Sequence, residues 1–307
     1  MKRLNLLLFT TMMAVCSYAQ DYVYTTDFSA EESGVTAMGN GQFVTTNEEG
    51  AIFSSYYKND GSAKRTSYCL LPEDVLAHSA TSKELCIAFW VRAQEDAQSN
   101  NYGYVPLFTA YTQAPRNGIN SYPMMACQYA GILQVNCNGW CDFTDALNVA
   151  GQNAEYRFDH DWLKDHKWHY YTAVFTETNA KVYFDGEVKN EWNVDGSSNG
   201  QIISGLFENG AELKYVCLGG NQTWDWNDND APFDFTHVLI MNKVMTPEAI
   251  MAQIKTDLGD HFDEYFASIK TIMSNKTDGK KYNLAGQQIT TGYKGIVIGQ
   301  GKKVLEK

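Results

Sequence analysis

The segment from Trp168 to Trp192 alternates its side chains with a period of two, broken by the polar stretch TETNA and by Asp185-Gly186. Such alternation is typical of β-strands, and Asp-Gly between two strands predicts a two-residue hairpin turn. The first run, WHYYTAVF, is bulky on both faces, which indicates a central strand covered on both sides. Three successive antiparallel strands are therefore predicted. One face of the first carries Trp168, Tyr170, Thr172 and Val174, and the other carries His169, Tyr171, Ala173 and Phe175.

Six further runs of this kind are separated by clusters of Gly, Asn, Asp and Ser. They cover residues 50–57, 84–93, 104–111, 131–137, 212–220 and 233–241. Many short strands joined by polar turns predict an all-β protein, a two-sheet antiparallel jelly roll. We expect Trp168, Phe184 and Val238 to share the interior between the two layers.

One helix is predicted after the last of these runs. Thr246 is a good N-cap, and Pro247 suits the first helical position. Ile250, Ile254 and Leu258 then recur every four residues, which gives the helix a single apolar stripe.

The first twenty residues have the pattern of a secretory signal peptide. Lys2 and Arg3 precede an apolar run, and small residues follow near Ala19 and Gln20. No later stretch offers the ~18 apolar residues of a membrane helix. We therefore expect a secreted protein without membrane insertion, extracellular or at the cell surface, with the periplasm as the alternative.

The chain is acidic, with a formal net charge of −12 that becomes more negative when the leader is removed. Nucleic acids and anionic lipids bind through Lys and Arg that neutralise phosphates, so both are excluded as general partners. Polyanionic polysaccharides are disfavoured for the same reason, unless a cation intervenes.

Six cysteines follow the leader, which permits up to three disulfides. The alternative is a set of buried thiols with at most one or two bridges. The spacing CNGWC could close a small loop, and no Cys-x-x-Cys pair points to a zinc ribbon. The six are Cys69, Cys86, Cys127, Cys137, Cys141 and Cys217.

Four segments together resemble the laminin-G-like members of the concanavalin A-like superfamily. They are ELCIAFWVRA (84–93), WHYYTAVFTETNAKVYFDGEVKN (168–190), LGGN (218–221) and FDFTHVLIMNKVMTPEAI (233–250). The resemblance runs from about Asp21 to Leu258 and implies a jelly roll over residues 21–259. The last core strand of the family usually carries consecutive acidic residues, whereas this chain reads Phe-Asp-Phe-Thr there.

The chain changes character near residue 260. Residues 260–280 are expected to be a linker with a strand at SIKTIM (268–273), and residues 281–307 a small β module of three short runs. KYNLAGQQITTGYKGIVIGQGKKVLEK resembles the C-terminal modules of exported Bacteroidetes proteins that relate to type IX secretion sorting domains. The resemblance implies surface delivery or anchoring.

The superfamily includes glycosidases and lyases, but the acid pairs of its endoglucanases, Glu-x-Asp-x-x-Glu on one strand, are missing. Glu191 and Asp195 come nearest, and they approach a turn. The stretch DHDWLKDHKWH (159–169) collects three His and three Asp without the spacing of a zinc protease, so it is expected to be a solvated loop rather than a metal site. A non-catalytic protein is predicted.

The polar stretch NQTWDWNDND (221–230) is the main candidate binding site. Sugar recognition uses aromatic faces together with amide and carboxylate oxygens, and calcium uses the same oxygens at close spacing. The alternative is two core-capping tryptophans below a solvated loop. The candidate ligand residues are Asn221, Trp224, Asp225, Trp226, Asp228 and Asp230, with Trp140 on a second loop.

The resemblance also implies a structural Ca2+ between an early acidic residue and the last strand, for which Asp27 and Asp234 are the matching positions. No other cofactor is expected. The sequence favours a lectin-like protein that binds a glycan or polysaccharide, with a protein-binding surface adhesin as the second hypothesis and a glycosidase or lyase as the third.

Overall fold

The structure is a computed structural model that describes most of the chain. The described residues are 21–61, 66–94, 104–114, 121–128, 132–136, 162–193, 205–219, 230, 232–267, 281–283, 288–289, 295–299 and 302–306. SIKTIM, and with it the predicted strand at 268–273, lies outside them.

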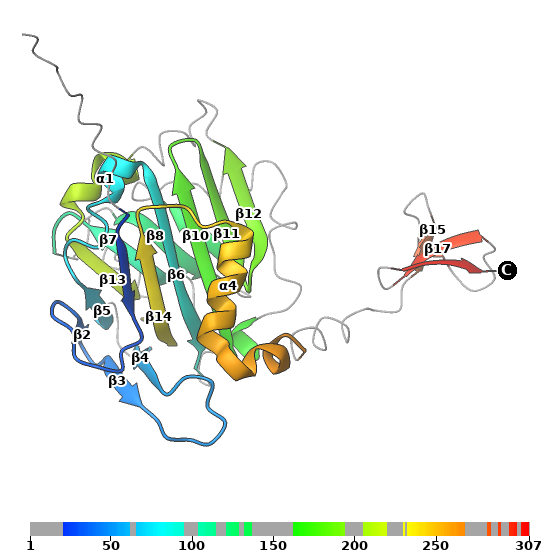
Figure 1. Cartoon of the computed structure of the whole chain (residues 1–307), viewed down its shortest axis with the longest axis horizontal. Coiled ribbons are helices and arrows are strands. Elements are labelled where there is room, and N and C mark those ends of the chain that lie inside the picture. Colours follow the sequence, from blue (N-terminus) through cyan, green and yellow to red (C-terminus); the bar gives the residue numbers. More distant parts are fainter. Residues whose placement is uncertain are drawn as a thin grey trace, which may run out of the picture.

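Two antiparallel sheets form the sandwich, as predicted (Figure 1). Sheet A has the order β12 (Glu187–Asn193), β11 (Asn179–Phe184), β10 (Trp168–Thr176), β6 (Glu84–Ala93), β14 (Phe233–Met241), β4 (Ser55–Lys58) and β3 (Gln42–Thr45), and β1 (Val23–Thr26) also pairs with β14. Sheet B has the order β2 (Thr36–Met38), β5 (Tyr68–Leu71), β13 (Tyr215–Gly219), β7 (Tyr104–Tyr111), β8 (Ser121–Gln128) and β9 (Ile132–Asn136). The predicted all-β jelly roll with one longer helix is confirmed.

A separate four-stranded sheet follows near the C-terminus, in place of the three predicted runs. Its order is β16 (Gln288–Ile289), β15 (Lys281–Asn283), β17 (Gly295–Gly299) and β18 (Lys302–Glu306). Helical structure elsewhere is short: α1 (Ser79–Ser82), residues 205–208 and 262–267, and the 3-10 turns η4 (Trp162–Lys164), η5 (Gly210–Glu212) and η6 (Gly259–His261). In the described part of the chain, no helix combines the length and apolar character needed to cross a membrane.

Sheet A is buried on both faces, and each face belongs to a different core. Phe184 and Val238 lie in the interior between the two sheets, as predicted. Trp168 instead faces the opposite side, where it belongs to a second core under α4 (Pro247–Leu258). The period of two separates the faces correctly, but it cannot tell which face looks towards the other sheet.

Helix α4 supplies the cover for this outer face, and Figure 1 shows it lying across sheet A. The Thr246 hydroxyl accepts a hydrogen bond from the Ala249 amide at 3.2 Å, which confirms the predicted N-cap. Ile250, Ile254 and Leu258 are buried as the predicted stripe. The α4 cover makes the outer face of sheet A a packed interface rather than a solvent-facing one.

The Asp185-Gly186 hairpin is confirmed, and its turn also packs against α4. Phe184 pairs with Glu187, and both loop residues have positive φ, 52° and 81°, as a type I′ turn requires. A Cβ on Gly186 would meet the Met251 sulfur at 2.2 Å, so a larger residue would have to displace the Met251 side chain of α4 and would be strained by the positive φ.

Residues 162–169, the described part of the stretch 159–169, are not the solvated loop expected from the composition. Trp162, Leu163 and His169 are buried. His169 lies between two carboxylates, with Nδ1 2.8 Å from Asp185 and Nε2 3.1 Å from Asp165. Burial opposes the charge of the imidazole, but the two carboxylates outweigh it and raise the pKa of His169 to about 9.

The same network ties the segment after α4 to the sandwich. The Tyr265 hydroxyl lies 2.8 Å from both the Trp168 carbonyl oxygen and Asp185 Oδ1, and Asp185 also accepts a hydrogen bond from the Tyr170 amide at 2.9 Å. Tyr265 is buried against Trp90 at a ring distance of 5.5 Å. The packed unit therefore continues past residue 260, into helical residues 262–267.

The buried imidazolium makes stability depend on pH. Because the pKa of His169 rises from its unfolded value of about 6.5 to about 9, its contribution is complete below pH 6.5 and is lost as pH rises towards 9. We expect the free energy of unfolding to fall by about 2 kcal/mol between pH 6.5 and 8, measured by urea titration.

His169→Gln is the matched variant, and its stability should change much less over this range. The range stops at pH 8 because buried Cys69, Cys86 and Cys217, whose pKa values are raised by burial, add their own loss above it. Equal slopes in the two proteins would contradict the assignment.

Candidate functional site

A row of four side chains crosses the outer face of sheet A at one end. The strand register places Lys58 of β4 opposite Asp234 of β14, Asp234 opposite Arg92 of β6, and Arg92 opposite Trp168 of β10. Cross-strand neighbours of this kind have Cβ atoms about 5 Å apart and interact directly. Residues far apart in the sequence thus form one line of cation, carboxylate, cation and aromatic ring.

Arg92 and Asp234 form the ion pair at the centre of the row. Asp234 Oδ2 accepts from Arg92 Nη2 at 2.6 Å and from Nε at 3.0 Å, and Oδ1 accepts from Gln94 at 3.0 Å. The side chain of Asp234 is 5% exposed and that of Arg92 30%. Burial raises the pKa of Asp234 even though Arg92 favours its charged form.

Aromatic rings hold the guanidinium of Arg92 from the other side. Its carbon lies 4.6 Å from the Trp168 ring centroid and 5.2 Å from that of Tyr56. These are cation–π distances, and Trp168 is itself held edge-on by Phe53 at 5.3 Å. The orientation of Arg92 is therefore fixed by an ion pair and two rings together.

Two adjoining cavities open beside this row, of about 420 and 430 Å³. Both are lined by Tyr56, Arg92 and His166, and we call the combined hollow the Arg92 groove. The first cavity extends between loop 46–53 and residues 261–265, and the second extends to Lys58, Gln94 and Asp234. Each has the size of an ordinary small-ligand site.

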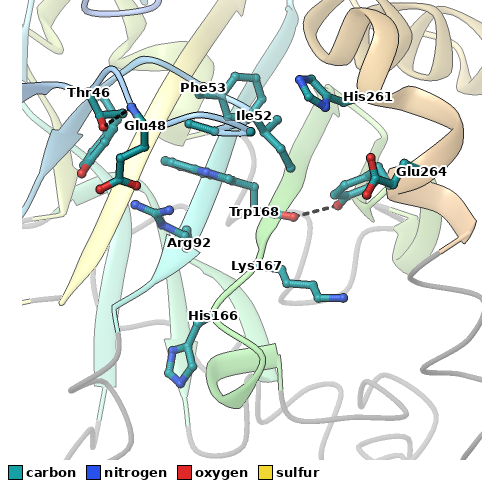
Figure 2. Close-up of a pocket in the computed structure, with 14 residues that line it drawn as sticks. Thr46, Glu48, Ile52, Phe53, Arg92, His166, Lys167, Trp168, His261 and Glu264 are labelled. Atoms are coloured by element: carbon teal, nitrogen blue, oxygen red, sulfur yellow. Dashed lines mark hydrogen bonds between the residues drawn. The ribbon is translucent and has the colours of Figure 1, made fainter.

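Figure 2 shows how the walls of the first cavity are built. Arg92 lies beside the Trp168 ring at the base, Glu48 stands on the loop from β3 to β4, and His261 and Glu264 project from the helical segment after α4. The Tyr265–Trp168 hydrogen bond, drawn dashed, holds that segment against β10. The groove thus depends on the His169 network for one of its walls.

The loops near this groove meet at one end of the sandwich, which we call the loop end. The Gln94 amide donates to the Pro232 carbonyl at 3.0 Å, and the Asn59 amide donates to the Phe233 carbonyl at 3.0 Å. The segments after β4, after β6 and before β14 therefore lie together. Of the candidate stretch 221–230, which lies between β13 and β14 in the sequence, the structure describes Asp230, two residues before Pro232 at this end.

Asp230 is the one residue of the predicted loop site that the structure describes. It is 2% exposed, and its Oδ2 accepts hydrogen bonds from the Thr66 amide at 2.8 Å and the Ser67 amide at 2.7 Å. In this state its carboxylate anchors the end of the loop to the start of β5. The other predicted ligand residues, Asn221, Trp224, Asp225, Trp226, Asp228 and Trp140, lie outside the described residues.

The two positions suggested for calcium lie in different surroundings. Asp27 accepts hydrogen bonds from the Ser29 amide and hydroxyl at 2.9 and 2.6 Å, and its own carbonyl accepts from Thr236 at 3.3 Å. Asp234 is occupied by Arg92 and Gln94. Across the described ranges, no three His, Cys, Asp or Glu side chains gather as a metal would need. The calcium site stays a prediction.

The cysteines of the described core are thiols. Cys69, Cys86 and Cys217 are free and buried, so three disulfides are ruled out in this structure. The alternative of buried thiols fits these three positions, and a single bridge is the most that the other mature cysteines could form.

The Arg92 groove was not among the sites predicted from the sequence. Its one signal is Arg92 itself, a charged residue inside the otherwise apolar run FWVRA. A charge within a strand that is buried on both faces needs a partner. The partner, Asp234, lies 142 residues further along the chain, so only the strand register brings them together.

Comparisons with known proteins give only distant similarities. No family model matches the chain, and no curated protein matches it. Among solved structures it is similar to the binding domain of botulinum neurotoxin serotype D/C, at 15% identity over 73% of this chain and 47% of that one, with a TM-score of 0.47. It is also similar to a mutant Trypanosoma rangeli sialidase displaying trans-sialidase activity, at 14% identity over 76% and 33% of the chains, with a TM-score of 0.45.

This chain spans less than half the length of those two proteins. Similarities of this strength carry no argument about function. The fold itself rests on the strand pairing of the structure, a two-sheet antiparallel sandwich.

The Arg92–Asp234 pair should be strongly coupled. Arg92→Ala leaves a nearly buried carboxylate without its guanidinium, and we expect it to lower the free energy of unfolding by about 2 kcal/mol. In the double variant with Asp234→Ala, the loss should be smaller than the sum of the two single losses. Urea titrations of the four proteins measure this, and additive losses would show that the pair is not coupled.

Asp230 should act as an anchor of the loop. Asp230→Ala leaves the amides of Thr66 and Ser67 without their acceptor, and we expect a loss of about 1–3 kcal/mol in stability. Asp60→Ala, at a more exposed acidic position of the same end, is the control and should cost less. Equal losses in the two variants would contradict the anchoring role.

Proposed function

We propose that the protein is a secreted, non-catalytic carbohydrate-binding protein of lectin type, acting outside the cell or at its surface. The proposal assigns the chain to the laminin-G-like group and gives the C-terminal sheet a part in delivery or anchoring. Binding of Ca2+ near Asp27 and Asp234 belongs to the same proposal.

The observation that carries the proposal is the position of the described residues on either side of residues 221–229. Gly219 ends β13 of sheet B, and Asp230 and Pro232 precede β14 of sheet A at the loop end. Asp230 ties the end of the stretch 221–230 to the start of β5 through two amide hydrogen bonds. A loop with two tryptophans and several Asn and Asp, held at its end by the sandwich, has the residue types that sugar rings and hydroxyls require.

The residues of this chain support ligand binding more than catalysis. The sandwich fold alone does not decide between the two, because function depends on the sites that a fold carries. The paired acids of the related glycosidases are missing from the sequence. Buried His169 and the partly buried Asp165 and Asp185 take part in the network that holds Tyr265, which gives these titratable residues a structural role.

Substitution of the two loop tryptophans tests the proposal. The best glycan is found on a glycan array and then titrated by calorimetry. Trp224→Ala and Trp226→Ala should each weaken its binding by about tenfold or more, because the packing of a sugar ring on the Trp side chain is lost. Tyr22→Ala is the control, since Tyr22 packs on His78 and pairs with Asn242, at the far end of β14 from the loop.

Two outcomes favour the other hypotheses. If no glycan on the array is bound, a protein-binding surface adhesin becomes the better explanation. If the protein releases products from a panel of polysaccharides, it is a glycosidase or lyase with catalytic residues of a different arrangement.

A further inference from the structure

The cavity between β4 and β6 has a local charge opposite to that of the chain. Lys58 and Arg92 line it together with Asp234, Gln94 and His166. Lys58 is exposed and Arg92 partly exposed, whereas Asp234 is almost fully buried behind Arg92. The side that meets solvent is therefore cationic, on a protein whose net charge is −12.

Arg92 still has donors to offer in this cavity. Its Nε and Nη2 are both used on one oxygen of Asp234, while Nη1 makes no hydrogen bond within the described structure. Guanidinium groups present five N–H donors in a rigid plane, and this plane is fixed by Trp168 and Tyr56. Nη1 is thus a pre-oriented, charged donor, and little entropy is lost when a ligand binds it.

Lys58 provides a second cation on the same row. It is exposed at the end of β4, opposite Asp234, and forms no ion pair within 4 Å among the described residues. A carboxylate placed over the row would lie between two cations, and Asp234 would compensate only one of them. Charge-assisted hydrogen bonds of this type are shorter and stronger than neutral ones.

The first cavity, between loop 46–53 and residues 261–265, offers an apolar wall and a polar wall to the part of a ligand that lies beyond its carboxylate. Tyr56 and Ile52 are partly exposed there, and Glu48, His261 and Glu264 are available for hydroxyl hydrogen bonds. The two volumes, about 420 and 430 Å³, accommodate one or two sugar rings rather than a long chain. Acidic Glu48, drawn beside Arg92 in Figure 2, and Glu264 on the opposite wall disfavour a second anionic group.

We propose that the Arg92 groove is a second binding site, which takes a sugar residue carrying a single carboxylate, with Arg92 Nη1 and Lys58 on the carboxylate and Tyr56 beside the ring. The sugar nature of the ligand rests on the proposed function, whereas the carboxylate rests on the row alone. None of the described residues that line the groove belongs to the stretch 221–230.

The test uses two glycosides that differ only in the carboxylate, methyl β-D-glucuronide and methyl β-D-glucoside, titrated into the full mature chain by calorimetry. We expect the glucuronide to bind about tenfold more tightly or better, and its affinity to fall as salt is raised. Acetate alone should bind far more weakly than the glucuronide. Equal affinity for the two glycosides, or for acetate and the glucuronide, overturns the proposal.

Two variants locate the binding. Lys58→Gln removes an exposed cation, and Arg92→Lys keeps a charge beside Asp234 but removes the planar donor Nη1. Each should weaken glucuronide binding by about fivefold or more and should lower the ratio of glucuronide affinity to glucoside affinity. Lys214→Gln is the control of equal charge change, because Lys214 is exposed and lines neither cavity. Glucuronide binding unaffected by both groove variants overturns the proposal.

The failure of this proposal is distinguishable from that of the proposed function. Trp224→Ala and Trp226→Ala should leave the affinity for the glucuronide unchanged. If either variant loses glucuronide binding, the carboxylate binds at the loop 221–230 and the groove proposal is refuted. Glycan binding that depends on Trp224 and Trp226, without any preference for the glucuronide, refutes the groove alone. A chain that binds no sugar at all refutes both.

Discussion

Burial of both faces of sheet A is the constraint on which the rest of the structure depends. Strands β6 and β10 have large side chains on each side, so one sheet opposite them is not enough to cover their apolar surface. Helix α4, loop 46–53 and the segment to Tyr265 provide the second cover. Because these three elements do not meet completely, they leave the Arg92 groove between them.

Much of this fold follows from short-range patterns. The period of two predicts β6, β7 and β14 with the bounds that the structure shows and β10 to within one residue. Asp185-Gly186 predicts the turn, and Thr246-Pro247 predicts the start of α4. The strands missed, such as β5 and β8, are short or mixed in composition, so the sandwich rather than their own sequence defines them. Both faces of β10 are apolar, and one packs on sheet B while the other packs under α4. The period of two separates the two faces but does not show that Trp168 lies on the α4 side.

The candidate site was less accessible to sequence reasoning than the fold. The predicted site was sought where aromatic and acidic residues are neighbours in the chain, as in 221–230. The Arg92 row instead combines Lys58, Arg92, Trp168 and Asp234 from four strands, and their register is a property of the folded sheet. Asp230 illustrates the same limit, since nothing in its own stretch of sequence shows that its carboxylate accepts hydrogen bonds from the Thr66 and Ser67 amides.

The hydrogen bonds of Tyr265 determine where a force on the C-terminal part of the chain would act. Within the described chain, Tyr265 is the last buried residue before the C-terminal strands, and its hydroxyl is hydrogen-bonded to the backbone of β10 and to Asp185 in the turn. If the C-terminus is tethered to a surface, any pull along it is applied first to this hydroxyl and to the short helix that carries His261 and Glu264. Traction on the tether would therefore act together on one wall of the groove and on the second core, to which Tyr265 belongs.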